Sequence, residues 1–472
     1  MSSPIIRIAA EEWRSLARNR AGLIATLLLL ALIIASAVVS FERRAGIEAE
    51  RARYQASVDK GFDNQPARHP HRMVHYGQFV FRPLSPLAFV DFGVDSFTGN
   101  TIFLEGHRQN SANFSEARQS SLLLRFGQLT PAFVLQALAP LLLIFLAFTS
   151  VARERERGTL RLLLAQGVSG QQLLAGKLLG HGVIALAIGA PAFLLLAWLA
   201  ASAVAPWGAV GLLILGYAAW LLLWATMSVL ISALVTRSRD ALVALVGIWM
   251  VSVILLPRGL PEAAANRAVL PSKIETEIAL HRDLKQIGDA HNPDDPYFAN
   301  FKARALAQYG VSRVEDMPVQ YAGLVGMEGE RLTTGLYAKS AREMEGREAE
   351  QNGFVRAFGT ISPLIAVRQL SMTLTGTGLA AHQDFLNQSE AFRYRFVQAL
   401  NWMQAEKIPS VGGGEDPRVS ADNWKTIPRF RYRPFVPPSA LIWPNLLVLG
   451  GWLAGLMLLS VPIARRLGRA AR

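Results

Sequence analysis

Apolar and polar residues alternate along this chain in long blocks. Six apolar runs are long enough, or nearly long enough, to cross a bilayer as helices, and they occupy residues 21–40, 129–150, 178–204, 207–234, 241–256 and 440–464. A spanning helix needs about 20 apolar residues, because it rises 1.5 Å per residue through roughly 30 Å of hydrocarbon. The fifth run is the shortest and falls below this length, but charged residues and Pro257 bound it, and we predict that it spans.

Residues 178–236 contain no Asp, Glu, Lys or Arg. The only break in this stretch lies around Pro206 and Gly208, which supply turn chemistry. We therefore predict two spans joined by a tight hairpin.

Arginines in the short connections predict the orientation. They cluster before the first span, at 153–161, at 237–239 and in the basic tail 465–472, and with six spans all four clusters fall on one side. The positive-inside rule makes that side the cytoplasm. Both termini are then cytoplasmic, and the two long connections, 41–128 and 257–439, lie outside the inner membrane.

The two extracytoplasmic segments have the patterns of folded structure. The first should continue the helix of span 1 and become extended around residues 75–94, whereas 319–350 and 383–406 show helical spacing of apolar positions. The predicted fold class is a mainly α membrane protein with six transmembrane helices and a large, mostly helical mixed extracytoplasmic domain.

Composition agrees with a protein of the lipid bilayer. Hydrophobic residues make up 51% of the chain and charged residues 18%, below the roughly one quarter of soluble domains. Arginines flanking the spans account for much of the net charge of +13, and without a nucleic-acid-binding module we expect no nucleic acid partner. The absence of cysteine excludes disulfides, thiolate metal sites and cysteine nucleophiles. Charges in residues 1–20 and the lack of a cleavage site predict that the first span is retained.

The connection between spans 2 and 3, residues 151–177, reads VARERERGTLRLLLAQGVSGQQLLAGK. A phosphate-binding P-loop needs four residues between its first glycine and Gly-Lys-Ser/Thr. Here five residues separate Gly170 from Gly176, and Leu178 replaces the hydroxyl residue, so we expect no nucleotide or other cofactor on this chain. The segment is either a plain charged loop that orients the helices or a helix–break–helix hairpin, interrupted at Gly167 and Gly170, that docks on a partner.

This connection, with the span pattern around it, resembles the coupling loop of ABC-2 type ABC transporter permeases, the type V-like membrane subunits. In particular it resembles a subgroup with large extracytoplasmic insertions. The resemblance implies a separate cytoplasmic ABC ATPase that holds ATP and magnesium, and a permease that works as a homodimer or with a second permease. The positions that match the family pattern, and that would contact the ATPase, are Glu154, Glu156, Gly158, Thr159, Leu160, Gly176 and Lys177.

Residues 1–20 place Ile5, Ile8, Trp13 and Leu16 on one apolar face beside arginines. Such a helix can lie in the headgroup plane, or the segment can be an ordinary charged flank. The resemblance implies a cytoplasmic amphipathic connecting helix packed beside the coupling loop.

Histidines raise two further possibilities. In a strand, His69, His71, Met73 and His75 would face one side and would suit copper, but Pro70 interrupts strand pairing and surface histidines often bind nothing, so no metal site is assigned. His181, inside the third span, is either functional or hydrogen-bonded to a neighbouring helix. No catalytic triad or carboxylate pair can be argued from the sequence, and we expect no catalytic residue in this chain.

The expected function is that of an ABC transporter permease subunit that couples ATP hydrolysis by a separate ATPase to translocation, in the export direction, across the inner membrane. The alternative is a non-transporting mechanotransmission subunit that passes ATP-driven motion to a periplasmic partner protein. A membrane-anchored receptor or sensor would not need six spans.

Overall fold

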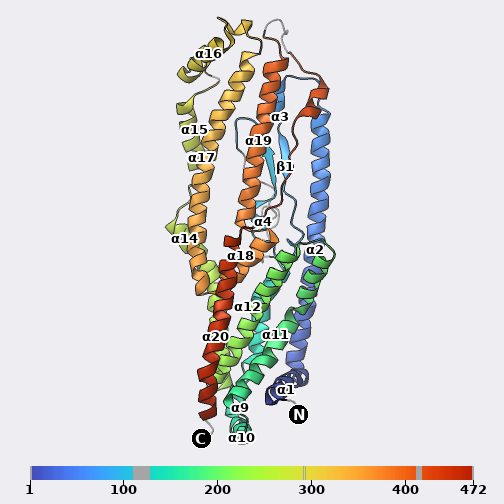
Figure 1. Ribbon diagram of the computed structural model, residues 1–472, viewed down its shortest axis with the longest axis vertical. Helices are drawn as coiled ribbons and strands as arrows, with labels where there is room; N and C mark the ends of the chain where they lie inside the picture. Colours follow the sequence, from blue (N-terminus) through green and yellow to red (C-terminus); the bar gives the residue numbers. More distant parts are fainter. Residues whose placement is uncertain (1–2, 110–127, 291, 293, 411–416, 470–472) are drawn as a thin grey trace.

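The computed structural model describes residues 3–109, 128–290, 292, 294–410 and 417–469. The molecule is elongated, and its helices run mostly along the long axis (Figure 1). The first helix and the end of the last helix lie at the same end, which we call the loop end (Figure 1). The predicted segments 41–128 and 465–472 extend into residues outside the described ranges, among them Arg472.

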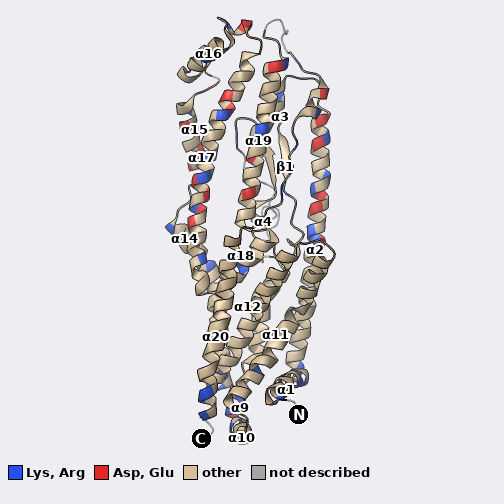
Figure 2. Cartoon of the chain, viewed as in Figure 1, with Lys and Arg blue, Asp and Glu red and all other residues tan. Residues whose placement is uncertain are grey.

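Six helical segments are long and apolar enough to cross a membrane within the part of the chain that the structure describes, which confirms the predicted fold class. Figure 2 shows a band almost free of charged residues along these helices, between the loop end and the charged remainder of the molecule. The six segments, together the membrane bundle, are Arg20–Asp63, Pro131–Glu156, Gly170–Ala201, Trp207–Leu234, Ser238–Arg267 and Ser439–Arg469.

Several of these segments are built from more than one element. The helices of the bundle are α2 (Arg20–Asp63), α7 (Pro131–Phe133), α8 (Ala139–Ala147), α9 (Ala152–Glu156), α11 (Gly170–Ala201), α12 (Trp207–Leu234), α13 (Ser238–Trp249), α14 (Leu256–Arg267) and α20 (Trp443–Arg469), with the π-helices η1 (Val134–Leu138) and η2 (Met250–Leu255). The fifth span continues through η2 into α14, which explains how its short apolar run still yields a helix long enough to cross.

The π-helix η1 in span 2 is held by two tryptophans. A π-helix shifts the hydrogen-bonding pattern of the backbone, and here the indole N–H of Trp220 donates to the carbonyl of Leu135 at 3.1 Å. Trp249 donates to the carbonyl of Ala137 at 3.0 Å. Spans 4 and 5 are thereby bonded to the backbone of span 2.

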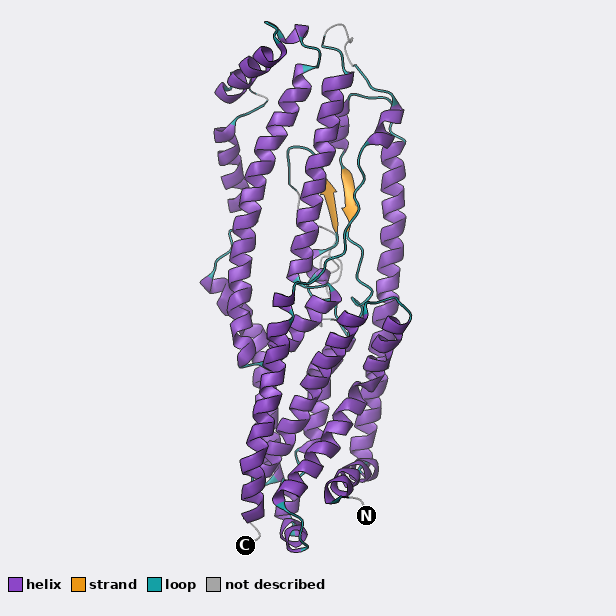
Figure 3. Ribbon diagram, in the orientation of Figure 1, coloured by secondary structure: helices purple, strands orange, loops and turns teal. Residues whose placement is uncertain are grey.

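At the end opposite the loop end, the chain forms the extramembrane domain, whose described residues are mostly helical with a two-stranded antiparallel sheet (Figure 3). Its α-helices are α3 (Pro70–Tyr76), α4 (Asp95–Thr98), α15 (Lys273–Ile287), α16 (Pro296–Tyr309), α17 (Tyr321–Ala357), α18 (Pro363–Thr375) and α19 (Leu379–Lys407). Among its described residues are also short turns of 3₁₀-helix, η3 (Val314–Asp316), η4 (Phe358–Thr360) and η5 (Ala421–Thr426), whereas the turn η6 (Ser439–Leu441) begins the sixth segment of the bundle. The strands β1 (Gln78–Phe81) and β2 (Thr101–Leu104) pair antiparallel, with Gln78 opposite Leu104.

The helices predicted at 319–350 and 383–406 are confirmed as α17 and α19, and α2 does continue span 1 outward. α2 has 44 residues in one unbroken helix, or about 66 Å at 1.5 Å per residue. Buried aromatic side chains join α2 and α19. The ring centroids of Phe62 and Phe396 are 5.7 Å apart, within the range of about 4.5–7 Å usual for aromatic pairs. The extramembrane part of α2 is therefore a rigid extension of span 1.

The first long connection is extended over part of the expected segment. Within residues 75–94, residues 78–81 form a strand. Residues 70–76 form the helix α3, so the strand arrangement considered for His69 to His75 does not occur. Pro70 occupies the first turn of α3, where a missing N–H costs nothing and the fixed φ favours the helix. His69 precedes it as the N-cap, and its Nδ1 accepts the N–H of His71 at 3.2 Å.

A polar chain joins the membrane bundle to the extramembrane domain. Gln136 of η1 donates to the hydroxyl of Tyr217 on α12 at 3.0 Å, and this hydroxyl lies 2.8 Å from that of Ser371 on α18. Ser371 donates in turn to Asp91 at 2.7 Å. Because Tyr217 is buried and these bonds satisfy its hydroxyl, a displacement of α12 must be shared with α18.

The orientation can be tested with single cysteines, since the chain has none of its own. Ser57→Cys and Ser312→Cys lie at exposed positions of the extramembrane domain, and Gln166→Cys is exposed at the loop end. We expect an impermeant maleimide to label the first two, and not the third, in spheroplasts. All three cysteines should react after the membrane is permeabilised. Labelling of position 166 alone in spheroplasts would show that the topology is the reverse of the predicted one.

Candidate functional site

The connection 151–177 folds as a helix–break–helix hairpin at the loop end (Figure 1). Its two short helices are α9 (Ala152–Glu156) and α10 (Thr159–Ala165). Gly158 between them has φ +74°, and Gly167 after α10 has φ +86°, a backbone conformation that favours glycine. Ser169 then opens α11 with a capping box, in which its hydroxyl accepts the N–H of Gln172 at 3.1 Å.

A buried lysine joins three helices at this hairpin. The ammonium of Lys177 on α11 donates to Glu12 of α1 (Pro4–Arg18) at 2.6 Å and to Glu154 of α9 at 2.5 Å. Lys177 is only 6% exposed. Because an isolated buried charge is strongly unfavourable, the three charged groups stabilise one another only while α1, α9 and α11 stay in contact.

His181 completes this cluster one helical turn along α11. Its Nε2 lies 3.1 Å from the second carboxylate oxygen of Glu12. Burial raises the pKa of Glu12, but the contacts with His181 and Lys177 outweigh it and hold that pKa at about 2, below the usual 4.5. Since the folded pKa is depressed, the stabilisation from Glu12 is complete above about pH 4.5 and is lost as the pH falls toward 2.

Two glycines let α1 approach α11 closely. A Cβ atom added to Gly176 would lie 2.6 Å from the Cβ of Ile8, and one added to Gly180 would lie 2.9 Å from the Cβ of Glu12. The structure thus places α1 directly beside the hairpin and the start of α11. Ile8 and Leu16 pack against the membrane core, whereas Trp13, predicted on the same face, is 39% exposed.

Hydrogen bonds also join α9 to α12. The hydroxyl of Ser232 accepts the N–H groups of Val151 and Ala152, each at 3.1 Å. Arg155 donates to the carbonyls of Ala233, at 2.8 Å, and Val235. These bonds satisfy free N–H groups at the start of α9 and free carbonyls at the end of α12.

The seven residues of the family pattern divide into two groups. Glu154, Gly176 and Lys177 face inward in the cluster just described. Leu160 is 3% exposed and belongs to the buried apolar core of the membrane bundle. Glu156, Gly158 and Thr159 lie on the exposed side.

Neither glutamate of the pattern projects freely from the hairpin. Glu156 accepts both the N–H and the hydroxyl of Ser238, at 2.8 Å each, and Thr159 donates to the carbonyl of Glu154 at 3.2 Å. Whether any of the seven residues contacts an ATPase stays a prediction.

The outward face of the hairpin is formed by residues that the sequence pattern did not single out. Leu162 is 62% exposed, and Arg157, Arg161, Ala165 and Gln166 are exposed around it. The sequence alone also did not identify Glu12 as the carboxylate that pairs with Lys177. A lysine at the start of an apolar span was a usable signal, because such a buried cation requires a nearby carboxylate.

Comparison with protein families assigns most of the chain to two models. Residues 102–270 match the ABC-2 family transporter protein model, and this range holds the hairpin and spans 2 to 5. Residues 273–433 match a domain of unknown function, DUF3526, which covers α15 to α19. No curated protein matches the chain.

The contact between α1 and α11 can be tested by adding one methyl group. Gly176→Ala should displace Ile8, loosen the packing of α1 and lower the unfolding temperature. Gly211→Ala on α12 is the control, because a Cβ atom added there would meet nothing within 4 Å. The control should be neutral or stabilising by up to about 1 kcal/mol, since alanine favours a helix over glycine. Unfolding temperature and the rate of tryptic cleavage at Arg14 and Arg18 are the measurements. Equal behaviour of both variants would contradict the close contact.

The charge cluster predicts a rescue experiment. Lys177→Met leaves two carboxylates together without a cation, and we expect a loss of about 3–5 kcal/mol. Adding Glu12→Gln and Glu154→Gln removes the uncompensated charges and should restore most of that stability. Denaturant unfolding in detergent measures the difference, and a triple variant as unstable as Lys177→Met would show that the ion pairs are not the stabilising feature.

Proposed function

We propose that this chain, with its ABC-2 family transporter region at 102–270, is the membrane-spanning permease subunit of an ABC transporter. In this proposal it couples ATP hydrolysis by a separate cytoplasmic ATPase to export of a substrate across the inner membrane. The observation that carries the proposal is the hairpin α9–α10, with an exposed outward face and an inward face bonded to α1, α11 and α12.

The outward face has the chemistry of a docking surface. Leu162 exposes an apolar side chain among exposed arginines at the loop end of the bundle, and protein interfaces combine an apolar centre, in which arginine is enriched, with a polar rim. Leu160 points the other way and lies in the membrane core. A force applied to α10 would therefore act directly on the packed spans.

The bonds of α9 define the path of that force. Lys177 links the hairpin to α1 and α11, and Ser232 with Arg155 links it to α12. Because removal of one partner from a buried ion cluster is costly, these helices should move with the hairpin rather than separate from it. ATP and magnesium would be held by the partner ATPase.

The bundle also has surfaces for a second permease copy. In spans 5 and 6 only 11% and 6% of the most apolar window is buried within this chain. Such faces can contact lipid or another membrane subunit. We propose a homodimer, or a pair with a second permease, in which span 5 contributes to the interface.

A second candidate function is mechanotransmission without transport, in which ATP-driven motion reaches a periplasmic partner protein. The observation that favours it is α2, whose 44 residues run unbroken from the bundle along the extramembrane domain (Figure 1). The series of hydrogen bonds from Tyr217 through Ser371 to Asp91 adds a second rigid link. A tilt of span 1 would then move the far end of the extramembrane domain.

Docking on the ATPase is tested by changing the outward face alone. Arg161→Glu with Leu162→Asp should lower recovery of the co-purifying ABC ATPase by at least about tenfold, since like charges and lost apolar contact at an interface cost several kcal/mol. Arg239→Glu, at another exposed arginine of the loop end, is the matched control and should retain the ATPase. Recovery is compared at equal membrane abundance.

Neither substituted side chain packs in the core, so both variants should insert and fold like the wild type. Unchanged ATPase recovery and ATPase activity with the Arg161/Leu162 variant would show that the hairpin is only an orienting loop.

A further inference from the structure

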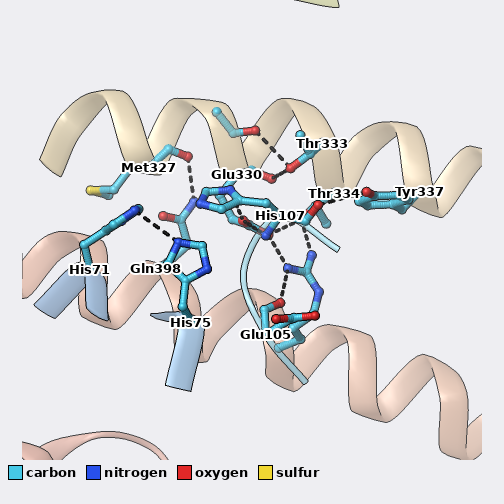
Figure 4. A network of polar contacts seen from close by, with 12 residues as sticks. His71, His75, Glu105, His107, Met327, Glu330, Thr333, Thr334, Tyr337 and Gln398 are labelled. Carbon is cyan, nitrogen blue, oxygen red and sulfur yellow. Dashed lines mark hydrogen bonds and ion pairs between the residues drawn. The ribbon is translucent and has the colours of Figure 1, made fainter. Parts of the chain in front are cut away.

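Three histidines from two separate segments meet in the extramembrane domain. His71 and His75 lie one turn apart on α3, and His107 follows β2 (Figure 4). One ring nitrogen from each of the three lies within 4.8 Å of the others. We propose that His71, His75 and His107 bind one divalent transition-metal ion, zinc or copper, at this site.

The geometry is close to that of a nitrogen-ligated ion. The Nε2 atoms of His71 and His75 are 3.2 Å apart. Two nitrogens bound to one tetrahedral zinc at 2.0–2.1 Å lie about 3.3 Å from each other. Histidines four residues apart on one helical face are also the spacing that zinc sites use.

His107 is held in place by the helix across from it. The backbone N–H of His107 donates to the carboxylate of Glu330 on α17 at 3.4 Å, and the backbone carbonyl of His107 accepts the hydroxyl of Tyr337 at 3.0 Å. Its backbone has φ +63°, which is uncommon for a residue other than glycine. These contacts fix the direction of the His107 side chain toward α3.

A buried carboxylate stands behind the His107 ring. Glu330, fully buried and paired with Arg393, has a carboxylate oxygen 3.7 Å from Nδ1 of His107 (Figure 4). A carboxylate behind a metal-bound imidazole orients the ring and strengthens it as a ligand. With Nδ1 directed at Glu330, Nε2 of His107 is the ligand atom.

The ligand set selects the class of metal. Three imidazoles suit zinc and copper, whereas calcium and magnesium prefer oxygen ligands. A cavity of about 870 Å³ is lined by His71 and His107 together with His281, and it gives an ion an entry path and leaves room for a further ligand such as water.

The residues differ from those that the alternating pattern suggested. His69 uses its Nδ1 to cap α3, and Met73 is completely buried in the hydrophobic core. The helical fold of 70–76 removes both from the cluster, and His107 replaces them.

Metal binding is measured on the full chain, purified in detergent and stripped with EDTA. We expect one zinc or copper ion per chain with micromolar or tighter affinity, and a cobalt-substituted form with the visible absorption of tetrahedral nitrogen coordination. His75→Gln and His107→Gln should each weaken binding by at least about 100-fold, because loss of a direct ligand should cost no less than the roughly 10–100-fold lost with an outer-shell partner. His281→Gln, in the same cavity but outside the cluster, is the matched control.

Because His75 is exposed, His75→Gln should unfold at the wild-type temperature without metal, and zinc should raise the unfolding temperature of the wild type but not of this variant. Failure of the wild type to bind zinc or copper would overturn the proposal. So would binding that His75→Gln and His281→Gln weaken equally, or calcium binding of the same affinity. None of these outcomes depends on whether the chain docks an ATPase.

Discussion

A lysine ammonium buried between two carboxylates holds the loop end of this protein together. Lys177, Glu12 and Glu154 come from α11, α1 and α9, and none of the three helices can leave without exposing the others to an uncompensated charge. Apolar packing in a bilayer gives little direction to helix association, because lipid tails are as apolar as leucine. The charge cluster supplies that direction, and glycines at the contact allow the backbones to approach.

From this cluster a series of short contacts extends through the membrane bundle to the extramembrane domain. α9 is bonded to α12 through Ser232, and α12 is bonded to α18 through the hydroxyls of Tyr217 and Ser371. α2 carries span 1 into the extramembrane domain as one helix. Because packed cores do not deform continuously, we expect a displacement at the hairpin to be passed on to the extramembrane domain.

The sequence was most informative where structure depends on local periodicity. Long apolar runs predicted the six spans, and helical spacing predicted α17 and α19. The partnership of Lys177 with Glu12 was missed because it joins distant residues and leaves no periodic signal. The strand arrangement considered for His69, His71, Met73 and His75 does not occur, because alternation is a weak criterion over seven residues and Pro70 in the first helical turn favours α3. His107 could not be found, since only the folded loop brings it to α3.

In the proposed mechanism, the hairpin transmits motion from a bound ATPase to the extramembrane domain. Pulsed EPR can measure this motion directly, with spin labels on cysteines at positions 57 and 312 of one chain, diluted with unlabelled protein and bound to the ATPase. We expect the distance distribution between the labels to change between the ADP and trapped ATP states in the wild type. We expect no change once Arg161→Glu and Leu162→Asp are introduced. A wild-type distance distribution that is the same in both nucleotide states, or a change that persists in the variant, would contradict this mechanism.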